Sequence, residues 1–323
     1  MTTLTQIKSS IAPELVQLNA IIKDMLDSPS ELTNTIVEHY LRTKGKQLRP
    51  IMVLLSGRLF GGITERVLYA AAGIEMLHNA SLIHDDVIDQ SRERRGIATI
   101  NSIWDNHVAV LVGDYFVGGA LKCAVKVGDM RVLKVLSRLG IDLSLGEIDQ
   151  IDIARSRNIA EQTYMNVIDR KTASLFTCCV EVGALAVDAP EEPSERLKKF
   201  ARLLGLCFQI KDDTFDYFND PVVGKPTGND LREGKITLPL IHALTVEHPM
   251  REKMLELTHK TELNDAEIEQ LVEYAKECGG IDYAYKVMDD LSSQAEAILD
   301  TFEPCPTIED FRAILHYIIE RNK

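Results

Sequence analysis

The feature that most constrains the fold is a long apolar run with helical spacing, which begins near Val67 and ends in three aspartates. A helix has 3.6 residues per turn, so Asp85, Asp86 and Asp89 gather near one edge of the predicted helix. A second apolar helical run ends with the same spacing, in Asp212, Asp213 and Asp216. One such cluster is typical of a solvated acidic face. Two clusters instead favour a shared counter-ion, and Mg²⁺ commonly binds carboxylates together with phosphate oxygens.

Helical periodicity covers most of the remaining chain, whereas alternating strand-like runs are few. We therefore expect an all-α protein with a single domain over residues 1–323, folded as a helical bundle around a central cavity. If the two acidic helices face each other in that bundle, six carboxylates line the mouth of the cavity. Besides the acidic helix that ends near residue 90, the expected helices cover residues 1–30, 31–43, 51–60, 102–127, 130–155, 160–187, 194–219, 236–247, 264–278, 281–302 and 307–321.

The composition excludes several classes of protein. A formal net charge of −13 argues against nucleic acid as a partner. No run of 18 uncharged apolar residues is present, and the first residues lack the pattern of a signal peptide, so we expect no membrane span. The six cysteines form no CxxC pair, which is typical of reduced thiols in a cytoplasmic protein.

Basic residues lie at the breaks between helices, close to the acidic clusters, and predict anion sites. Lys46 and Arg49 belong to the break 44–50, and Arg94 and Arg95 to the polar loop 91–96. Three lysines are associated with the second cluster: Lys171, Lys225 and Lys235. Any one of them alone could be an ordinary surface lysine. As a set they favour phosphate binding, in which arginine offers a fork of donors and lysine a point charge.

Taken together, these motifs resemble those of the all-trans isoprenyl (polyprenyl) diphosphate synthases, of the long-chain type that includes octaprenyl diphosphate synthases. The resemblance covers residues 44 to 240. It rests on the stretches 45–50, 78–89, 94–96, 146–150, 171–173, 205–216, 224–226, 228–230 and 233–235. Two departures are small: Lys44 replaces a usual glycine, and Ala98 stands where the family often has proline. Both leave the geometry of their loops open.

The resemblance implies a role for each group. Mg²⁺ is the implied cofactor, as three ions with substrate bound. Its implied ligands are Asp85, Asp86, Asp89 and Asp212, completed by Asp213 and Asp216, partly through water. The groups implied to contact the allylic diphosphate are Arg94, Lys171, Lys225 and Lys235. Those implied to bind isopentenyl diphosphate are Lys46, Arg49, His78 and Arg95. Thr172 and Gln209 would lie beside the reacting carbons. Catalysis would therefore involve Asp85, Asp86, Asp89, Lys171, Thr172, Gln209 and Asp212, in a homodimer.

Product length depends on the side chains below the first acidic cluster. One turn before Asp85 lie Ala80 and Ser81, where the family's short-chain enzymes place a bulky aromatic residue. Met76 and Leu77 lie one turn further. Two small residues predict an open floor and a product of about 40 carbons. Release of so apolar a product predicts peripheral contact with a membrane.

Four alternatives remain to be weighed. A farnesyl or geranylgeranyl diphosphate synthase shares the fold, but Ala80 and Ser81 argue against the shorter product. A terpene cyclase or head-to-head condensing enzyme would not need Lys46, Arg49 and Arg95. A non-catalytic regulatory subunit of a heteromeric synthase would be expected to lose carboxylates. An acidic metal-binding scaffold leaves the basic breaks unexplained.

Overall fold

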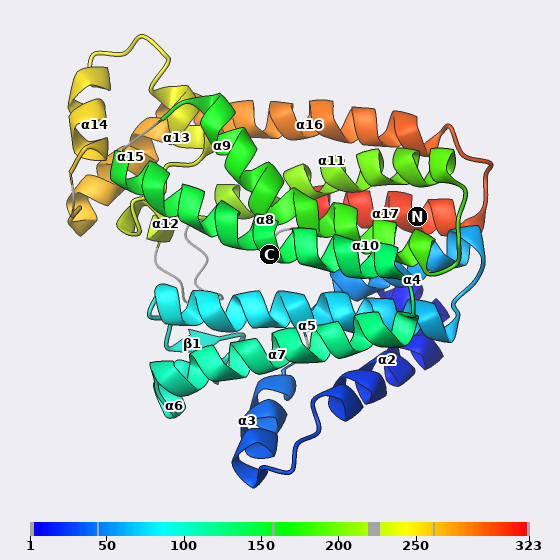
Figure 1. Cartoon of the computed structure of the whole chain (residues 1–323). Coiled ribbons are helices and arrows are strands. Elements are labelled where there is room, and N and C mark those ends of the chain that lie inside the picture. The colour runs from blue at the N-terminus through cyan, green and yellow to red at the C-terminus, as the bar shows by residue number, and fades with distance from the viewer. Residues whose placement is uncertain (1–2, 44, 157–158, 219–226, 261, 322–323) are drawn as a thin grey trace. The chain divides into compact units, whose positions relative to one another are not determined.

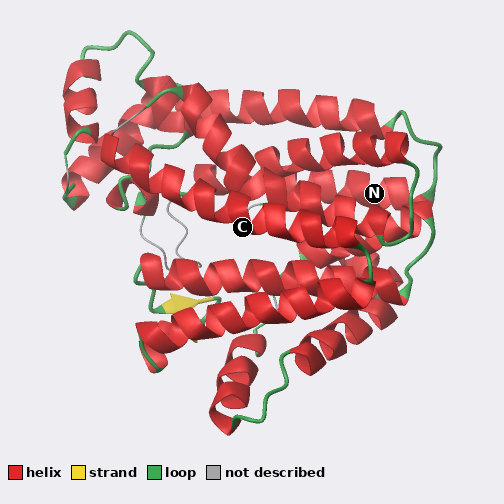
Figure 2. Ribbon diagram, viewed as in Figure 1, coloured by secondary structure: helices red, strands yellow, loops and turns green. Residues whose placement is uncertain are grey.

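The computed structural model describes residues 3–43, 45–156, 159–218, 227–260 and 262–321, and their regular secondary structure is almost entirely helical (Figures 1 and 2). The predicted all-α class is confirmed. The chain divides into two compact units. Unit 1 comprises Met1–Gly140, Phe176–Lys198 and Pro304–Ala313, and unit 2 comprises Ile141–Leu175, Lys199–Glu303 and Ile314–Lys323. The single domain stays a prediction, and each unit is described separately.

Unit 1 is organised around α5, the helix that ends in the first acidic cluster. Its own helices are α1 (Leu4–Ser10), α2 (Ala12–Met25), α3 (Glu31–Leu41), α4 (Leu48–Phe60), α5 (Glu65–Ile88), α6 (Ile100–Ile103) and α7 (Asn106–Val127). Most of α5 is buried, and it packs most extensively on α7. Small residues allow this approach: a Cβ on Gly119 would lie 2.9 Å from the sulfur of Met76.

A two-stranded hairpin, β1 (Glu93–Arg94) and β2 (Ile97–Ala98), follows α5 in the segment that was predicted as a polar loop. Its two turn residues are Arg95 and Gly96, with φ of 54° and 77°. Positive φ at both central positions is the type I′ pattern, whose twist matches that of paired strands. The tight turn fixes the backbone positions of Arg94 and Arg95.

Unit 2 contains α9 (Glu161–Ile168), the π-helix η1 (Asp169–Ala173), α12 (Asn229–Arg232), α13 (Leu238–Ala243), α14 (Arg251–Thr258), α15 (Asp265–Glu277) and α16 (Gly280–Leu299). Four further helices have residues in both units: α8 (Met130–Ser156), α10 (Ser174–Leu185), α11 (Glu191–Phe215) and α17 (Pro306–Glu320).

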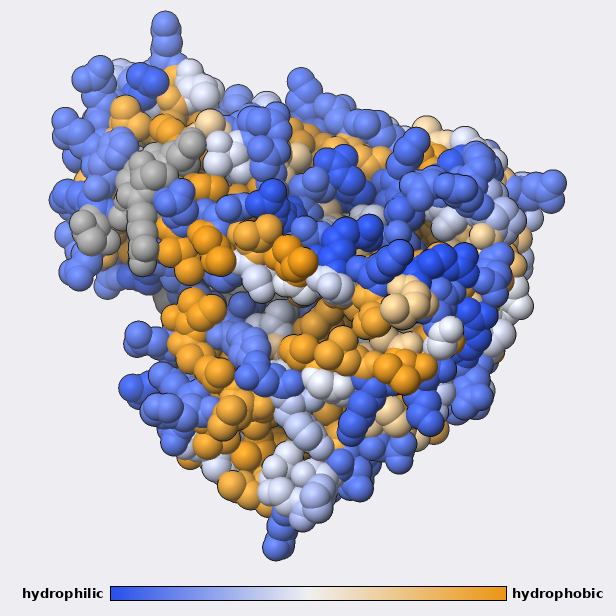
Figure 3. Space-filling view, in the orientation of Figure 1, coloured by the Kyte–Doolittle hydropathy of each residue, from blue (hydrophilic) through white to orange (hydrophobic). Residues whose placement is uncertain are grey.

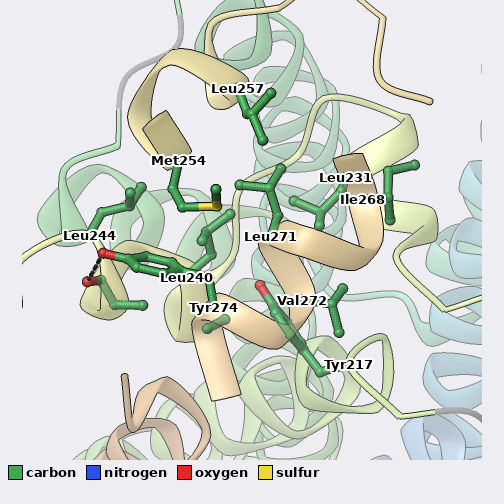
Figure 4. Close-up of a cluster of buried hydrophobic side chains, with 12 residues drawn as sticks. Tyr217, Leu231, Leu240, Leu244, Met254, Leu257, Ile268, Leu271, Val272 and Tyr274 are labelled. Atoms are coloured by element: carbon green, nitrogen blue, oxygen red, sulfur yellow. Dashed lines mark hydrogen bonds between the residues drawn. The ribbon is translucent and has the colours of Figure 1, made fainter. Parts of the chain in front are cut away.

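Figure 4 shows a buried cluster of unit 2 in which side chains from α12, α13, α14 and α15 meet. Within it the Tyr274 hydroxyl donates to the carbonyl oxygen of Ala243 at 3.0 Å. Another member, Tyr217, has its hydroxyl 3.0 Å from that of Thr237, just before α13. The cluster thus anchors the start of α13, which directly follows the loop that carries Lys235.

Several predicted helix boundaries were wrong. The expected helix 1–30 is interrupted at Ile11, and α2 starts there with Pro13 in its first turn, where proline is tolerated. Pro50 and Pro193 likewise sit in the first turns of α4 and α11 rather than before them. The expected helix 160–187 is interrupted by η1, and α14 was not predicted.

Helix α7 is long and apolar enough to cross a membrane by length and composition alone. That test is also passed by core helices, and one face of α7 is buried against α5 within unit 1. Its other face exposes apolar side chains, notably Leu111 and Val125, at 67% and 75% exposure. We therefore interpret α7 as a core helix of unit 1 with an apolar outer stripe.

Candidate active site

The first acidic cluster lies at the C-terminal end of α5, and its three carboxylates differ in accessibility. Asp86 is 4% exposed and accepts a hydrogen bond from Nε of Arg94 at 2.8 Å. Burial raises the pKa of Asp86, and the guanidinium of Arg94 opposes that rise. Asp85 is half-buried and Asp89 is exposed, so these two present oxygens at the surface of unit 1.

A basic group forms in unit 1 around His78, which is buried two turns before Asp85 on the same helix. Burial, followed by the charges of Arg49, Arg95 and Arg94, holds the pKa of His78 well below its usual value. The imidazole is therefore neutral at pH 7, and it can act as a hydrogen-bond donor but not as a cation. The predicted association of Arg49, His78 and Arg95 is thus present within unit 1.

Gly45 positions Arg95 from the opposite side of this group. A Cβ added to Gly45 would lie 2.7 Å from Cζ of Arg95, so the guanidinium packs directly on the glycine. Lys46, next in the chain, is exposed; burial lowers the pKa of Lys8, and the charge of Lys46 lowers it further. Two ammonium groups near each other make this edge of the site strongly positive.

The four residues predicted to govern product length differ in their surroundings. Ala80 and Met76 are fully buried, Leu77 is 9% exposed and Ser81 is half-buried, with its hydroxyl donating to the carbonyl of His78. At 100° per residue, Ser81 and Leu77 lie nearer than Met76 to the face that carries Asp85. Because Met76 packs on Gly119 of α7, it belongs to the contact between α5 and α7.

His84, which directly precedes the cluster, contacts α7. Its Nε2 lies 3.2 Å from the carbonyl oxygen of Val110 and 3.5 Å from a carboxylate oxygen of Asp114. A Cβ on Gly113 would lie only 2.2 Å from the same nitrogen. Gly113 is therefore needed where α7 passes this imidazole.

In unit 2, a chain of hydrogen bonds links three predicted site residues to a tyrosine. The Thr172 hydroxyl donates to Oε1 of Gln209 at 2.6 Å, and Nε2 of Gln209 donates to Asp213 at 2.7 Å. The hydroxyl of Tyr164 donates to the other oxygen of Asp213 at 2.6 Å. Burial raises the pKa of Asp213 to about 7, although both hydrogen bonds oppose the rise.

Lys171 and Thr172 both lie in η1, a π-helical turn of the kind that often marks functional sites. The ammonium of Lys171 is paired with Glu147 and donates to Gln150 at 2.9 Å, both on α8. A Cβ on Gly146 would meet the backbone of Lys171 at 3.1 Å, so this glycine allows α8 and η1 to approach. The stretches 146–150 and 171–173 are thus adjacent within unit 2.

A cavity of about 150 Å³ in unit 2 brings five predicted residues together. They are Lys171, Thr172, Gln209, Asp213 and Lys235, and Tyr164 and Asp230 also line the cavity. Of the other predicted aspartates of this unit, Asp212 is paired with Arg321, and Asp216 accepts from the backbone amides of Asn229 and Asp230. Lys225, together with its neighbours 224 and 226, lies outside the described residues.

The residues present fit Mg²⁺ only together with a further ligand. In the part of the chain that the structure describes, no group of three His, Cys, Asp or Glu side chains could hold a metal ion by itself. Mg²⁺ commonly takes one or two carboxylates and fills its octahedron with water and diphosphate oxygens. Asp85 and Asp89, at i and i+4 on one edge of α5, suit that mode of binding.

Sequence reasoning missed several residues around these groups. Tyr164 and Glu147 lie far along the chain from Asp213 and Lys171, and only the fold brings them together. Arg321, near the C-terminus, packs its guanidinium 4.2 Å from the ring centre of Phe208 and reaches Asp212. Sequence reasoning also did not single out Glu75, although a lone carboxylate in an apolar helical run can indicate a functional residue.

Comparisons with known proteins agree with this arrangement. A family profile described as "Polyprenyl synthetase" matches residues 30–275. The octaprenyl diphosphate synthase of Escherichia coli is 32% identical over 99% of both chains.

Two solved structures are similar over nearly their whole length. The decaprenyl diphosphate synthase of Rhodobacter capsulatus has a TM-score of 0.92 and 31% identity, covering 99% of both chains. A polyprenyl synthase of Caulobacter crescentus, complexed with calcium and isoprenyl diphosphate, has a TM-score of 0.92 and 30% identity, covering 100% of this chain and 99% of that one. This chain therefore belongs to the polyprenyl synthetase family and is an all-trans polyprenyl diphosphate synthase, which is a prenyltransferase.

Proposed function

We propose that this enzyme condenses isopentenyl diphosphate head-to-tail onto an allylic diphosphate, with Mg²⁺, and that its product has about 40 carbons. The observation that carries the reaction is the layout of α5. Asp85 and Asp89 are accessible at its end, and His78 lies seven residues earlier, beside Arg49 and Arg95. Seven residues rise about 10 Å along a helix, a spacing that suits two diphosphates bound side by side.

Different residues of the chain bind the two diphosphates in this proposal. Arg49, His78 and Arg95, with Lys46, hold the diphosphate of isopentenyl diphosphate, and Arg94 is held by Asp86 for the allylic diphosphate. The family resemblance assigns Lys171, Lys235 and Lys225 to the same diphosphate, the leaving group. Mg²⁺, when bound by the carboxylates, neutralises the charge that develops on this leaving group. The calcium and isoprenyl diphosphate in the Caulobacter structure support these ligand classes.

The proposed reaction has three steps. The allylic C–O bond ionises, the isopentenyl double bond attacks the allylic carbon, and a proton is lost to the released diphosphate. Thr172 and Gln209, hydrogen-bonded to each other, present oxygens that can stabilise the transient positive charge. The network through Asp213 and Tyr164 fixes their orientation.

Long product length is supported by Ala80 and Ser81, which leave room one turn below Asp85. The test is product analysis with Mg²⁺, farnesyl diphosphate and labelled isopentenyl diphosphate. A discrete product near 40 carbons is expected. A product of 20 carbons would keep the reaction but overturn the argument from Ala80 and Ser81. No product from folded protein would favour a non-catalytic subunit.

We further propose a homodimer formed through the outer stripe of α7. The stripe comprises Val110, Leu111, Leu121 and Val125, all more than 40% exposed. Apolar surface lies along α7 in Figure 3 as well. A stripe of this kind favours a second copy of the chain, because two-fold dimers bury the same patch twice. Light scattering should give twice the chain mass, and Leu121→Glu should give the monomer.

Product release is proposed to involve brief membrane contact by an enzyme that resides in the cytoplasm. Ile88 and Ile103, each about half exposed, lie on the neighbouring helices α5 and α6 and could touch a bilayer. All six thiols are free, which supports a reducing compartment. Flotation with liposomes during turnover should carry the protein upward, and no association with or without substrate would reject the contact.

A further inference from the structure

Glu75 is a buried acid inside the basic group of unit 1. It lies one turn before His78 on α5, is 8% exposed, and has no hydrogen bond or ion pair among the described residues. Its side chain lines a cavity of about 630 Å³ together with Gly45, Gln47 and Arg95. A buried carboxylate without a hydrogen-bond partner is costly, so it calls for an electrostatic reason.

The charges around Glu75 supply that reason. Burial is the largest influence on the carboxyl group and raises its pKa, and the charges of Arg49 and Arg95 oppose that rise and favour the carboxylate. Neither guanidinium forms an ion pair with Glu75, so the carboxylate does not orient them by direct contact. It acts on the basic group through its field, which is weakly screened in the interior.

The chemistry of chain growth indicates how the field of Glu75 could act on a bound diphosphate. In each condensation the allylic C–O bond breaks and the new C–C bond forms, so the elongated product keeps the diphosphate that arrived with isopentenyl diphosphate. That diphosphate is left on Arg49, His78 and Arg95. For the next addition it must leave this group and become the allylic leaving group. Two guanidinium groups and a neutral imidazole donor, without a counter-charge nearby, would retain it.

We propose that Glu75 weakens diphosphate binding at the isopentenyl site, and so allows the growing chain to move on after each addition. This inference rests on the proposed function. Glu75 touches no reacting atom in this scheme. Its carboxylate repels the diphosphate held by Arg49 and Arg95, and it thereby trades affinity for turnover.

The test is Glu75→Gln, which removes the charge and keeps the shape. We expect KM for isopentenyl diphosphate to fall about tenfold, equivalent to about 1.4 kcal/mol of binding. We also expect kcat to fall and products to become shorter. A structural defect would not tighten binding. An unchanged or raised KM in folded Glu75→Gln would overturn the proposal.

Two control variants isolate the charge. Glu75→Asp keeps the carboxylate and should retain the wild-type KM. Glu38→Gln removes a carboxylate that lines the same cavity from α3, where its side chain is 64% exposed, and should change nothing. A KM lowered equally by Glu38→Gln would reject a specific role for Glu75.

A binding measurement separates this inference from the proposed function. Calorimetric titration with isopentenyl diphosphate alone needs no turnover. If the wild-type protein makes no product, the proposed function fails, but tighter binding by Glu75→Gln would still support the field effect. If the wild-type protein is active and Glu75→Gln binds no more tightly, the inference fails and the proposed function stands.

Discussion

Gly45→Ala tests the proposed isopentenyl diphosphate site with a single methyl group. The added Cβ would lie 2.7 Å from both Cζ and Nη2 of Arg95 and 2.9 Å from Nη1. Ordinary contact requires about 3.5 Å, so the guanidinium must retreat by roughly 0.8 Å. Gly45 does not have positive φ, so alanine strains no backbone there. Arg95 belongs to a two-residue turn with both φ positive, which leaves its backbone little freedom to follow.

The expected rise in KM follows from the hydrogen bond that Gly45→Ala would weaken. A hydrogen bond between charged groups contributes about 1.5–3 kcal/mol, so weakening one between Arg95 and the diphosphate should raise KM about tenfold or more. The guanidinium is the end of a flexible side chain, so stability should change by less than about 1 kcal/mol. Steady-state rates with varied isopentenyl diphosphate should show the raised KM, and KM for the allylic substrate should stay constant.

A double-mutant cycle decides whether Arg95 carries the effect. Asparagine tolerates the left-handed conformation of the turn, so Arg95→Asn removes the guanidinium and preserves the hairpin. In that background Gly45→Ala should cause almost no further change, because the group it displaces is gone. An equal loss in both backgrounds would refute the reasoning and assign the effect of Gly45 to its own loop.

Four other predictions concern the acidic clusters, the product and the packing. Asp85→Ala should lower turnover at least about 100-fold with an unchanged circular dichroism spectrum, whereas near-normal turnover would remove the metal hypothesis. Ala80→Phe should shorten the product to about 15–20 carbons by blocking the floor, and an unchanged product distribution would place the tunnel elsewhere. Asp213 binds its proton more tightly when folded, so stability should fall as pH rises from about 4 to 7, with a slope of at most about 1.4 kcal/mol per pH unit, and denaturant titrations of Asp213→Asn should lack this component. Gly113→Ala should destabilise unit 1 by about 1–3 kcal/mol because its Cβ would overlap His84, and an unchanged thermal midpoint would contradict that packing.

The all-α class and the positions of the charged groups could be predicted because both follow from local patterns. Helical periodicity places Asp85 and Asp89 on one edge whatever the tertiary structure. The glycine and proline of the break 44–50 likewise mark where Lys46 and Arg49 leave regular helix. The helix boundaries were less predictable, because proline is compatible with the first turn of a helix as well as with a break, as at Pro50 and Pro193.

The remaining features depend on contacts between distant segments. Arg95 adopts a left-handed conformation that arginine rarely favours, and only the hairpin that it closes explains it. No local sequence pattern predicts the π-helix η1, which places Lys171 beside Glu147 and Gln150. Asp213 obtains its partner Tyr164 from 49 residues away. The accessibility of each aspartate therefore could not be predicted from spacing alone.

The two acidic clusters nevertheless share the same arrangement of aspartates around the helix. In each, the first and last aspartates are four residues apart and lie within 40° of each other around the helix, whereas the middle one is turned 100° from the first. The structure has a buried middle residue in both clusters: Asp86, held by Arg94, and Asp213, held by Tyr164 and Gln209. The spacing thus leaves Asp85 and Asp89 accessible at the end of α5, and in both clusters the middle aspartate is hydrogen-bonded to side chains of its own unit. A motif interpreted only as six equivalent ligands misses this second task, in which the middle carboxylate holds Arg94 in one cluster and Gln209 in the other, two residues proposed to act on the substrate.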